Sequence, residues 1–302
     1  MKTSRRNFIK TSAITLAGTS LFSSSLFASG KRNEIVGVQL YSIREEMGKD
    51  PLGTLKQVAN MGYKHVEHAN YVNRKFYGYN AVEFKKILDD LGLKMPSGHT
   101  VLKVDHWDKK KNDFTDAWKY TVEDAATCGQ QFVVSPALES GLRKNYNAFM
   151  QFMEIFNKSG ELCQKSGMKF GYHNHDFEFS LKLDNKNMFD LIMNNTDPDR
   201  VSMQLDIGNM YIAGARATDI INKYPGRFEN IHVKDMIKKE NGGEGFESTI
   251  LGKGLVDPKK VIDLSRKKGG TRIFIIEQES YQGISPLECI KQDLKIMKGW
   301  GY

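Results

Sequence analysis

Short apolar runs, rich in β-branched and aromatic residues, alternate with amphipathic stretches along most of this chain. The runs have the character of buried strands, and the stretches between them have the period of helices that cover a core. Strands that alternate with helices form a parallel sheet, because each helix carries the chain back to the same edge. Eight such runs are present, at residues 35–40, 65–67, 94–99, 132–135, 169–172, 201–205, 231–233 and 273–276.

Helix ends between these runs are marked by capping residues. Asp50, Asp257 and Ser285 each precede a proline, which is the arrangement of an N-cap followed by proline at the first helical position. Asn80 and Glu83 have the spacing of a capping box. Such helix-end signals recur along the chain, so the sequence predicts a regular series of strand and helix pairs.

Eight strand and helix units predict an α/β fold of the (β/α)8 TIM barrel class. An open doubly wound sheet is the alternative, but residues 39–44 after the first strand lack the glycine-rich loop that binds dinucleotides or phosphate. Residues 31–302 have the length of one such barrel and contain no linker rich in proline, glycine or serine. The lysine- and aspartate-rich segment 103–116 is predicted to be a loop over the barrel mouth.

The first thirty residues are predicted to be a twin-arginine export signal. Arg5 and Arg6 precede an uncharged, moderately apolar stretch at residues 11–28, and a small-residue cleavage site follows at residues 28–30. The alternative is a chance arginine pair in an ordinary secretory signal. Export of a folded protein would suit a chain that acquires its metal before it crosses the membrane, and it predicts a periplasmic location.

Charge and cysteine content narrow the range of partners. The predicted leader holds four positive charges and no acidic residue, so the net charge of +8 falls to +4 without it. Such a mild excess, without basic clusters interleaved with aromatics, argues against a nucleic-acid partner. The widely spaced Cys128, Cys163 and Cys289 are predicted to be buried thiols. Beyond the leader, no segment is apolar and long enough to anchor the chain in a membrane.

Four consecutive strands, the fifth to the eighth, end in residues that can bind a divalent metal ion. His173 and His175 follow the fifth strand, and Asp206, His232 and Glu277 mark the sixth, seventh and eighth. Alone, each is more often a hydrogen-bonded structural residue. Because a barrel brings the carboxyl ends of its strands to one face, His173, Asp206, His232 and Glu277 are predicted to share one ion. Mixed imidazole and carboxylate ligands favour Mn²⁺, Co²⁺, Zn²⁺ or Fe²⁺ over Mg²⁺.

Several segments in this order resemble the sugar phosphate isomerase/epimerase family, which has a xylose isomerase-like TIM barrel. The resemblance covers nearly all of residues 31–302, and it is carried by residues 37–42, 171–179, 205–209, 232–235, 252–254 and 276–279. It implies a metal bound by Asp206, His232 and Glu277 and by a fourth ligand after the fifth strand. That fourth position holds His173, where family enzymes hold a glutamate.

The same resemblance implies chemistry next to a sugar carbonyl, with departures. Family enzymes use two glutamates as an acid and base pair, and only Glu277 of that pair is present. Asn209 stands where epimerases more often carry a histidine. Proton transfer is therefore predicted to come from His175 or Lys234, with Glu67, His99 and metal-bound water as further candidates, and Glu279 is predicted to orient a ligand histidine.

We therefore assign catalysis to Glu277, His175 and Lys234, and substrate binding to Glu67, His99, Asn209 and Tyr41. For Glu67 and His99 the alternative is a buried polar layer in the barrel mouth. The predicted function is metal-dependent isomerisation, epimerisation or β-elimination of a small carbohydrate, with lyase or hydrolase-like chemistry on keto-sugars or glycosides as a variant. The alternative is an exported carbohydrate-binding barrel without catalysis. The sequence leaves homo-oligomerisation open.

Overall fold

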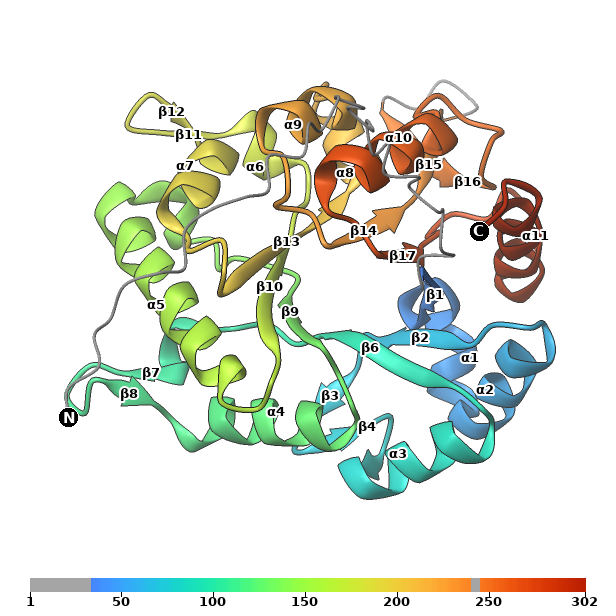
Figure 1. Ribbon diagram of the computed structural model, residues 1–302, viewed down its shortest axis with the longest axis horizontal. Helices are drawn as coiled ribbons and strands as arrows, with labels where there is room; N and C mark the ends of the chain where they lie inside the picture. The colour runs from blue at the N-terminus through green and yellow to red at the C-terminus, as the bar shows by residue number, and fades with distance from the viewer. Residues whose placement is uncertain (1–33, 240–244) are drawn as a thin grey trace, which may run out of the picture. The chain divides into compact units, whose positions relative to one another are not determined.

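The computed structural model describes residues 34–239 and 245–302, and the predicted leader lies outside these residues. Eight parallel strands form a closed barrel in the order β1-β17-β14-β13-β10-β9-β6-β2 (Figure 1). The predicted (β/α)8 fold is therefore confirmed. The barrel strands are β1 (Ile35–Gln39), β2 (His65–His68), β6 (Lys94–His99), β9 (Phe132–Ser135), β10 (Lys169–His173), β13 (Val201–Asp206), β14 (Asn230–Val233) and β17 (Ile273–Ile276).

The α-helices lie outside the ring of strands (Figure 1). They are α1 (Arg44–Lys49), α2 (Pro51–Asn60), α3 (Ala81–Asp90), α4 (Asp116–Thr127), α5 (Tyr146–Gln164), α6 (Phe177–Ser180), α7 (Met188–Asn195), α8 (Ile207–Ile212), α9 (Ala217–Lys223), α10 (Pro258–Leu264) and α11 (Pro286–Gly299). The side chains of Asp50, Asp257 and Ser285 each accept a backbone N–H at a helix start, and Asn80 with Glu83 forms the predicted capping box. None of the helices in the described residues has the length and apolar composition that crossing a bilayer requires.

The loops around the barrel contain short helical turns and small antiparallel sheets. The 3-10 turns are η1 (Leu40–Ile43), η2 (Val104–His106) and η3 (Leu142–Lys144), and a π-helical turn, η4, spans Ser265–Gly269. The small antiparallel sheets are β3 (Tyr71–Val72) with β4 (Lys75–Phe76) and β5 (Tyr79–Asn80), β7 (Trp107–Asp108) with β8 (Asp113–Phe114), β11 (Lys182–Leu183) with β12 (Lys186–Asn187), and β15 (Asp235–Lys238) with β16 (Phe246–Thr249). Segment 103–116, predicted to be a loop, thus contains η2 and the hairpin β7–β8.

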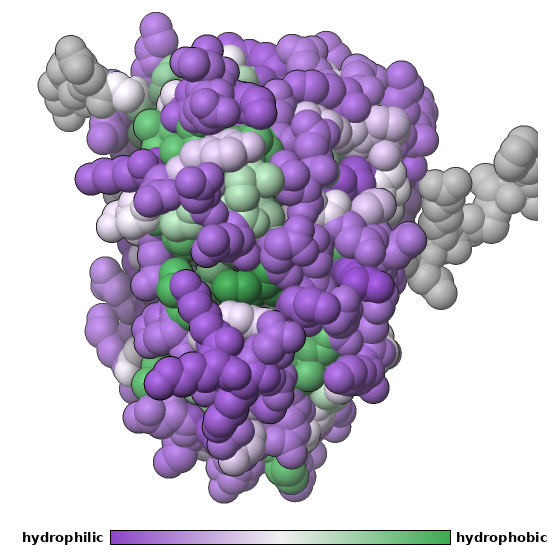
Figure 2. Space-filling model, turned by 90° about the vertical axis from the view of Figure 1, so that its left-hand side faces the viewer, coloured by the Kyte–Doolittle hydropathy of each residue, from purple (hydrophilic) through white to green (hydrophobic). Residues whose placement is uncertain are grey.

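The main core lies between the barrel and its helices. Apolar side chains of the barrel strands and of most helices are buried there, which removes their hydrophobic area from water. A second, smaller cluster of Phe132, Val134, Ile273 and Ile275 is separate from that layer. All three cysteines are buried and free, as predicted. The face shown in Figure 2 carries mainly hydrophilic side chains, with apolar ones gathered in small patches between them.

Strand register brings the carboxyl ends of the second half of the barrel together. Asp206 of β13 lies directly opposite His232 of β14. His173 of β10 lies opposite Gln204, two residues before Asp206 and therefore on the same side of that strand. Ile276 of β17 pairs with Val233, so the next residue in the chain leaves the barrel beside β14. Parallel pairing alone thus places the predicted ligands at one rim.

Candidate metal centre and its cavity

The four predicted metal ligands lie together at the carboxyl rim of the barrel. His173, Asp206, His232 and Glu277 are all buried, and each offers one ligand atom such that these atoms lie within 4.8 Å of one another. They come from four neighbouring strands, β10, β13, β14 and β17. The structure therefore brings together residues that are as far apart in the sequence as His173 and Glu277.

The donor set fits a divalent transition metal. Two imidazoles and two carboxylates are ligands that Zn²⁺, Mn²⁺, Co²⁺ and Fe²⁺ accept. The ring of His173 is held at Nδ1, which lies 3.0 Å from Gln204 Oε1, and its Nε2 is 3.8 Å from Asp206 Oδ2. Asp206 Oδ2 is buried within the cluster and forms an ion pair with the ammonium of Lys234 at 2.9 Å. A buried carboxylate oxygen that is already paired with a positive charge can also serve as a ligand atom for a metal cation.

Lys234 is the one ammonium group in contact with this cluster within the described residues. Its Nζ lies 2.9 Å from Asp206 Oδ2, 2.8 Å from Glu277 Oε2 and 2.7 Å from Glu279 Oε1. Burial alone would lower the pKa of Lys234, but these carboxylates outweigh it and raise the pKa well above its usual value. Burial alone would raise the pKa of Glu277, but Lys234 and His232 outweigh it and lower this pKa well below its usual value. The cluster is thus adapted to hold positive charge.

Glu67 contacts the metal-ligand cluster from the barrel interior, on the side away from the cavity. Its Oε1 accepts a hydrogen bond from His232 Nε2 at 2.6 Å, and its Oε2 accepts bonds from Gln204 Nε2 at 2.7 Å and from Ser97 Oγ. Burial would raise the pKa of Glu67, but His99 and His232 lower it to about 2. Glu67 is wholly buried and does not line the cavity. The sequence suggests either substrate binding or a place in a buried polar layer for Glu67, and its position agrees with the buried layer.

Gln204 completes that layer, and sequence analysis overlooked it. Its amide accepts from His99 Nε2 at 2.6 Å and from His173 Nδ1 at 3.0 Å while it donates to Glu67. A signal was present, because Gln204 is a polar residue inside a wholly buried strand and lies two positions before Asp206. That spacing places both side chains on the same side of the strand.

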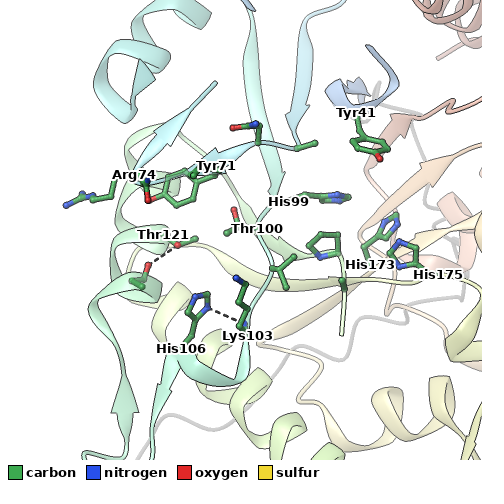
Figure 3. A pocket seen from close by; sticks show the side chains of 18 of the residues that line it. Tyr41, Tyr71, Arg74, His99, Thr100, Lys103, His106, Thr121, His173 and His175 are labelled. Carbon is green, nitrogen blue, oxygen red and sulfur yellow. Dashed lines mark hydrogen bonds between the residues drawn. The ribbon is translucent and has the colours of Figure 1, made fainter. Parts of the chain in front are cut away.

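A cavity of about 1090 Å³ opens over the metal ligands. His99, Asn209 and Tyr41, predicted to bind substrate, line it together with His173, His175, Glu277 and Glu279. In Figure 3 Tyr41 lies across the cavity from His173 and His175, with His99 beside them. Lys234 is buried behind this wall and donates to two of its residues, to Glu279 Oε1 at 2.7 Å and to Asn209 Oδ1 at 3.4 Å.

His175 is positioned as a neutral base at the cavity wall. Its Nδ1 is buried and has no hydrogen-bond partner among the described residues. Burial lowers the pKa of His175, and the positive charge of Lys234 lowers it further. The backbone N–H of His175 donates to Glu178 Oε2 at 2.8 Å, which fixes the loop that carries the ring. His175 lines the cavity, so its imidazole can accept a proton from a molecule bound there.

Comparison with known proteins agrees with this architecture. The chain belongs to the xylose isomerase-like TIM barrel family, whose model matches residues 55–300. The predicted resemblance is therefore confirmed at the level of the barrel family. A crystal structure of a sugar phosphate isomerase/epimerase from Parabacteroides distasonis ATCC 8503 superposes with a TM-score of 0.73 at 25% identity, over 90% of this chain and 96% of that one.

Curated relatives match over a shorter span. An inosose dehydratase of Clostridium beijerinckii is 25% identical over 177 residues, which cover 54% of this chain and 58% of the relative. An inosose dehydratase of Clostridium perfringens (strain 13 / Type A) is 28% identical over 180 residues, 54% of this chain and 59% of the relative. The match thus spans a little over half the length of these relatives.

Proposed function

We propose that this protein is a metal-dependent lyase that removes a proton next to the carbonyl of a sugar or cyclitol and expels the β-substituent. The observation that carries the proposal is the contact of Lys234 with Glu277 and Glu279, two residues that line the cavity together with His175. This arrangement offers one base and one acid of different chemical type. Such a pair suits elimination, in which one group loses a proton and another gains one.

The metal would be held by His173, Asp206, His232 and Glu277. Bound there, a divalent cation supplies a Lewis acid that stabilises the negative charge developing on the carbonyl oxygen. The polar layer of Glu67 and Gln204 keeps two of these imidazoles in fixed orientations.

The protein groups would perform the proton transfers. His175 accepts the proton from the carbon next to the carbonyl, and a carbon–carbon double bond forms as the β-carbon loses its oxygen. Lys234 gives a proton to that departing oxygen, with Glu279 holding the ammonium in place at 2.7 Å. His175 ends protonated and Lys234 neutral, and exchange with solvent restores both. Asn209 and His99 line the same space and can hydrogen-bond substrate hydroxyls.

The inosose dehydratase relatives support elimination, since dehydration of a keto-cyclitol is this reaction class. Isomerisation or epimerisation is the second candidate, favoured by the similarity to the sugar phosphate isomerase/epimerase structure over most of the chain. Both reactions begin with the same proton abstraction. An epimerase also returns the proton to the opposite face of the substrate. Family enzymes use a second glutamate for that step, and in this chain His173 occupies the position of that glutamate.

A deuterium-exchange experiment tests the proposal. The protein, loaded with Mn²⁺ or Zn²⁺, is incubated in D₂O with 2-keto-myo-inositol and a panel of ketoses and 3-keto-glycosides and followed by NMR and absorbance. We expect exchange next to the carbonyl, and a conjugated carbonyl product identifies elimination. A rearranged ketose without loss of water identifies the second candidate.

Matched histidine variants make that experiment specific. His175→Asn should slow exchange by about 100-fold or more with its metal content unchanged. His65→Asn, which alters a half-buried histidine bonded to Val36 O at the other end of a barrel strand, should leave exchange unaffected. Exchange that persists in His175→Asn would refute the assigned base. Carbohydrate binding without metal dependence or turnover would instead indicate the non-catalytic barrel.

A further inference from the structure

The cavity over the metal ligands continues into a second region that the proposed reaction does not use. We call this region the outer arm and define it by Tyr71, Arg74, Lys103, His106, Ala117 and Tyr120, all of which line the cavity. These residues follow β2 and β6 in the chain or lie on α4, whereas the metal ligands come from β10, β13, β14 and β17. Figure 3 shows Tyr71, Arg74, Lys103 and His106 on the side of the cavity away from His173 and His175.

We propose that the outer arm binds a second sugar ring, so that the substrate is a glycoside of disaccharide size whose reacting ring lies over the metal ligands. This inference rests on the proposed function. The volume of the cavity exceeds what one ring needs. Cavities that hold drug-sized ligands measure about 300–1,000 Å³, and this one measures about 1090 Å³. A single sugar ring is much smaller than a drug-sized ligand, and it would leave the outer arm without an occupant.

Hydrogen bonds and ion pairs hold the wall of the outer arm in place. Arg74 Nε and a terminal guanidinium nitrogen donate to both oxygens of Asp124, at 3.0 and 2.6 Å, and Tyr71 Oη donates to the same carboxylate at 2.6 Å. Asp124 is buried on α4, so these bonds fasten the β3–β4 hairpin to that helix. A wall fixed before binding costs little conformational entropy when a ligand arrives.

The turn at the hairpin tip places Arg74 toward α4. Asn73 and Arg74 are the two central residues of the turn between β3 and β4, since Val72 pairs with Lys75. Their φ values of 51° and 61° are the left-handed ones that a two-residue hairpin turn requires at both positions. The ion pair of Arg74 with Asp124 joins this turn to α4.

The side chains that line the outer arm can contact a sugar ring. Tyr120 is 40% exposed, and the guanidinium of Arg74 lies 4.1 Å from its ring centroid, which steadies the ring. Exposed aromatic rings offer apolar area to the C–H face of a sugar. Lys103 is exposed and has no ion-pair partner in the described part of the chain, so its ammonium is free to donate to hydroxyls.

Charge limits which second ring fits. Among the described residues that line the cavity, the carboxylates are Glu277 and Glu279, and both belong to the metal-ligand end. The outer arm therefore offers donors and cations to its ligand but no anion. A neutral or acidic ring suits it, because no carboxylate among the described residues lines the arm to pair with the ammonium of an amino sugar, and Lys103 would repel it.

Affinities for one-ring and two-ring probes test the inference by isothermal titration calorimetry on the metal-loaded protein. The one-ring probe is methyl 3-keto-glucopyranoside, and the two-ring probes are cellobiose, maltose and trehalose, each oxidised at C3 of one ring. We expect at least one two-ring probe to bind about tenfold or more tightly than the one-ring probe. Equal affinity of all probes, or binding of none, would overturn the inference.

Variants locate that gain in the outer arm. Ala117 is exposed on α4, so Ala117→Trp should fold normally, fill the arm and abolish the gain while one-ring affinity stays within about twofold of wild type. Ala117→Ser is the matched control and should keep the gain. Tyr120→Ala should reduce it, and Tyr120→Phe should preserve it. A gain that survives Ala117→Trp would place the second ring elsewhere. Absence of deuterium exchange with intact length preference would refute only the proposed reaction.

Discussion

Glu67 Oε1 lies 2.6 Å from His232 Nε2, on the opposite side of the imidazole from the metal-ligand cluster. The other ring nitrogen, Nδ1, faces Glu277 Oε2 at 2.9 Å. A carboxylate in this position fixes the tautomer and orientation of a ligating imidazole and raises its basicity. Glu67 therefore acts on the metal site through His232, and its full burial keeps it away from substrate.

Removal of that negative charge should weaken metal binding. Glu67→Gln keeps the shape of the side chain, and we expect metal affinity to fall by about 10–100-fold. Competition with a chromogenic chelator measures the change. Glu178→Gln is the control, because Glu178 is another buried glutamate that contacts Tyr172 and the backbone of His175 but no predicted ligand side chain. Unchanged metal affinity in Glu67→Gln would show that His232 does not ligate a metal in this orientation.

Replacement of Lys234 should affect catalysis and metal binding differently. Its ammonium competes with a cation for Asp206 and Glu277, so Lys234→Met should bind metal as tightly as wild type or more tightly. Loss of the proton donor should lower turnover by about 100–10,000-fold. Elemental analysis and steady-state rates on one preparation test both effects. Lys253→Met, an exposed lysine outside the cavity lining, serves as the control. Coupled loss of metal and activity would identify Lys234 as a structural residue.

Gly208 provides the space for that lysine. A Cβ at this position would lie 2.7 Å from Lys234 Cδ and 2.7 Å from its Cγ, closer than carbon atoms approach without displacement. We expect Gly208→Ala to shift the ammonium and lower turnover by about tenfold or more, with a smaller effect on metal content. Gly48→Ala is the control, since a Cβ there meets no atom. A Gly208→Ala protein with wild-type turnover would show that the position of Lys234 is not critical.

Much of this architecture could be predicted from the sequence because its signals are local. Buried strands read as apolar runs, helix starts carry their own caps, and a ligand such as His232 or Glu277 lies where a strand ends. The direction of Glu67 could not be predicted, because the pairing of β2 with β6 shifts register between His65 and Glu67. The outer arm depends on contacts between β3, β4 and α4 that are distant in sequence. The twin-arginine leader stays a prediction, since it lies outside the described residues.

Asp293 gives the fold a dependence on pH that is independent of the metal site. This carboxyl lies on α11, where its Oδ1 accepts the backbone N–H of Leu251 at 2.9 Å and its Oδ2 is buried with no partner among the described residues. Burial raises the pKa of Asp293 to about 7, and the charge of Asp235 contributes in the same direction. The folded protein therefore holds a proton that the unfolded chain releases near pH 4. Stability contributed by this group is complete below about pH 4 and is lost as the pH rises to about 7.

Asp293→Asn should remove that loss. The amide oxygen can still accept from Leu251, and the side chain no longer ionises, so the gain in the free energy of unfolding over wild type should grow from pH 5 to pH 8. Three pKa units correspond to about 4 kcal/mol as an upper bound. Urea unfolding at the two pH values measures the difference. Asp263→Asn is the opposite control, because hydrogen bonds from Tyr302 and Lys259 lower the pKa of Asp263, and its replacement should bring no gain at pH 8. A constant offset between Asp293→Asn and wild type at both pH values would show that Asp293 is ionised in the folded protein throughout this range.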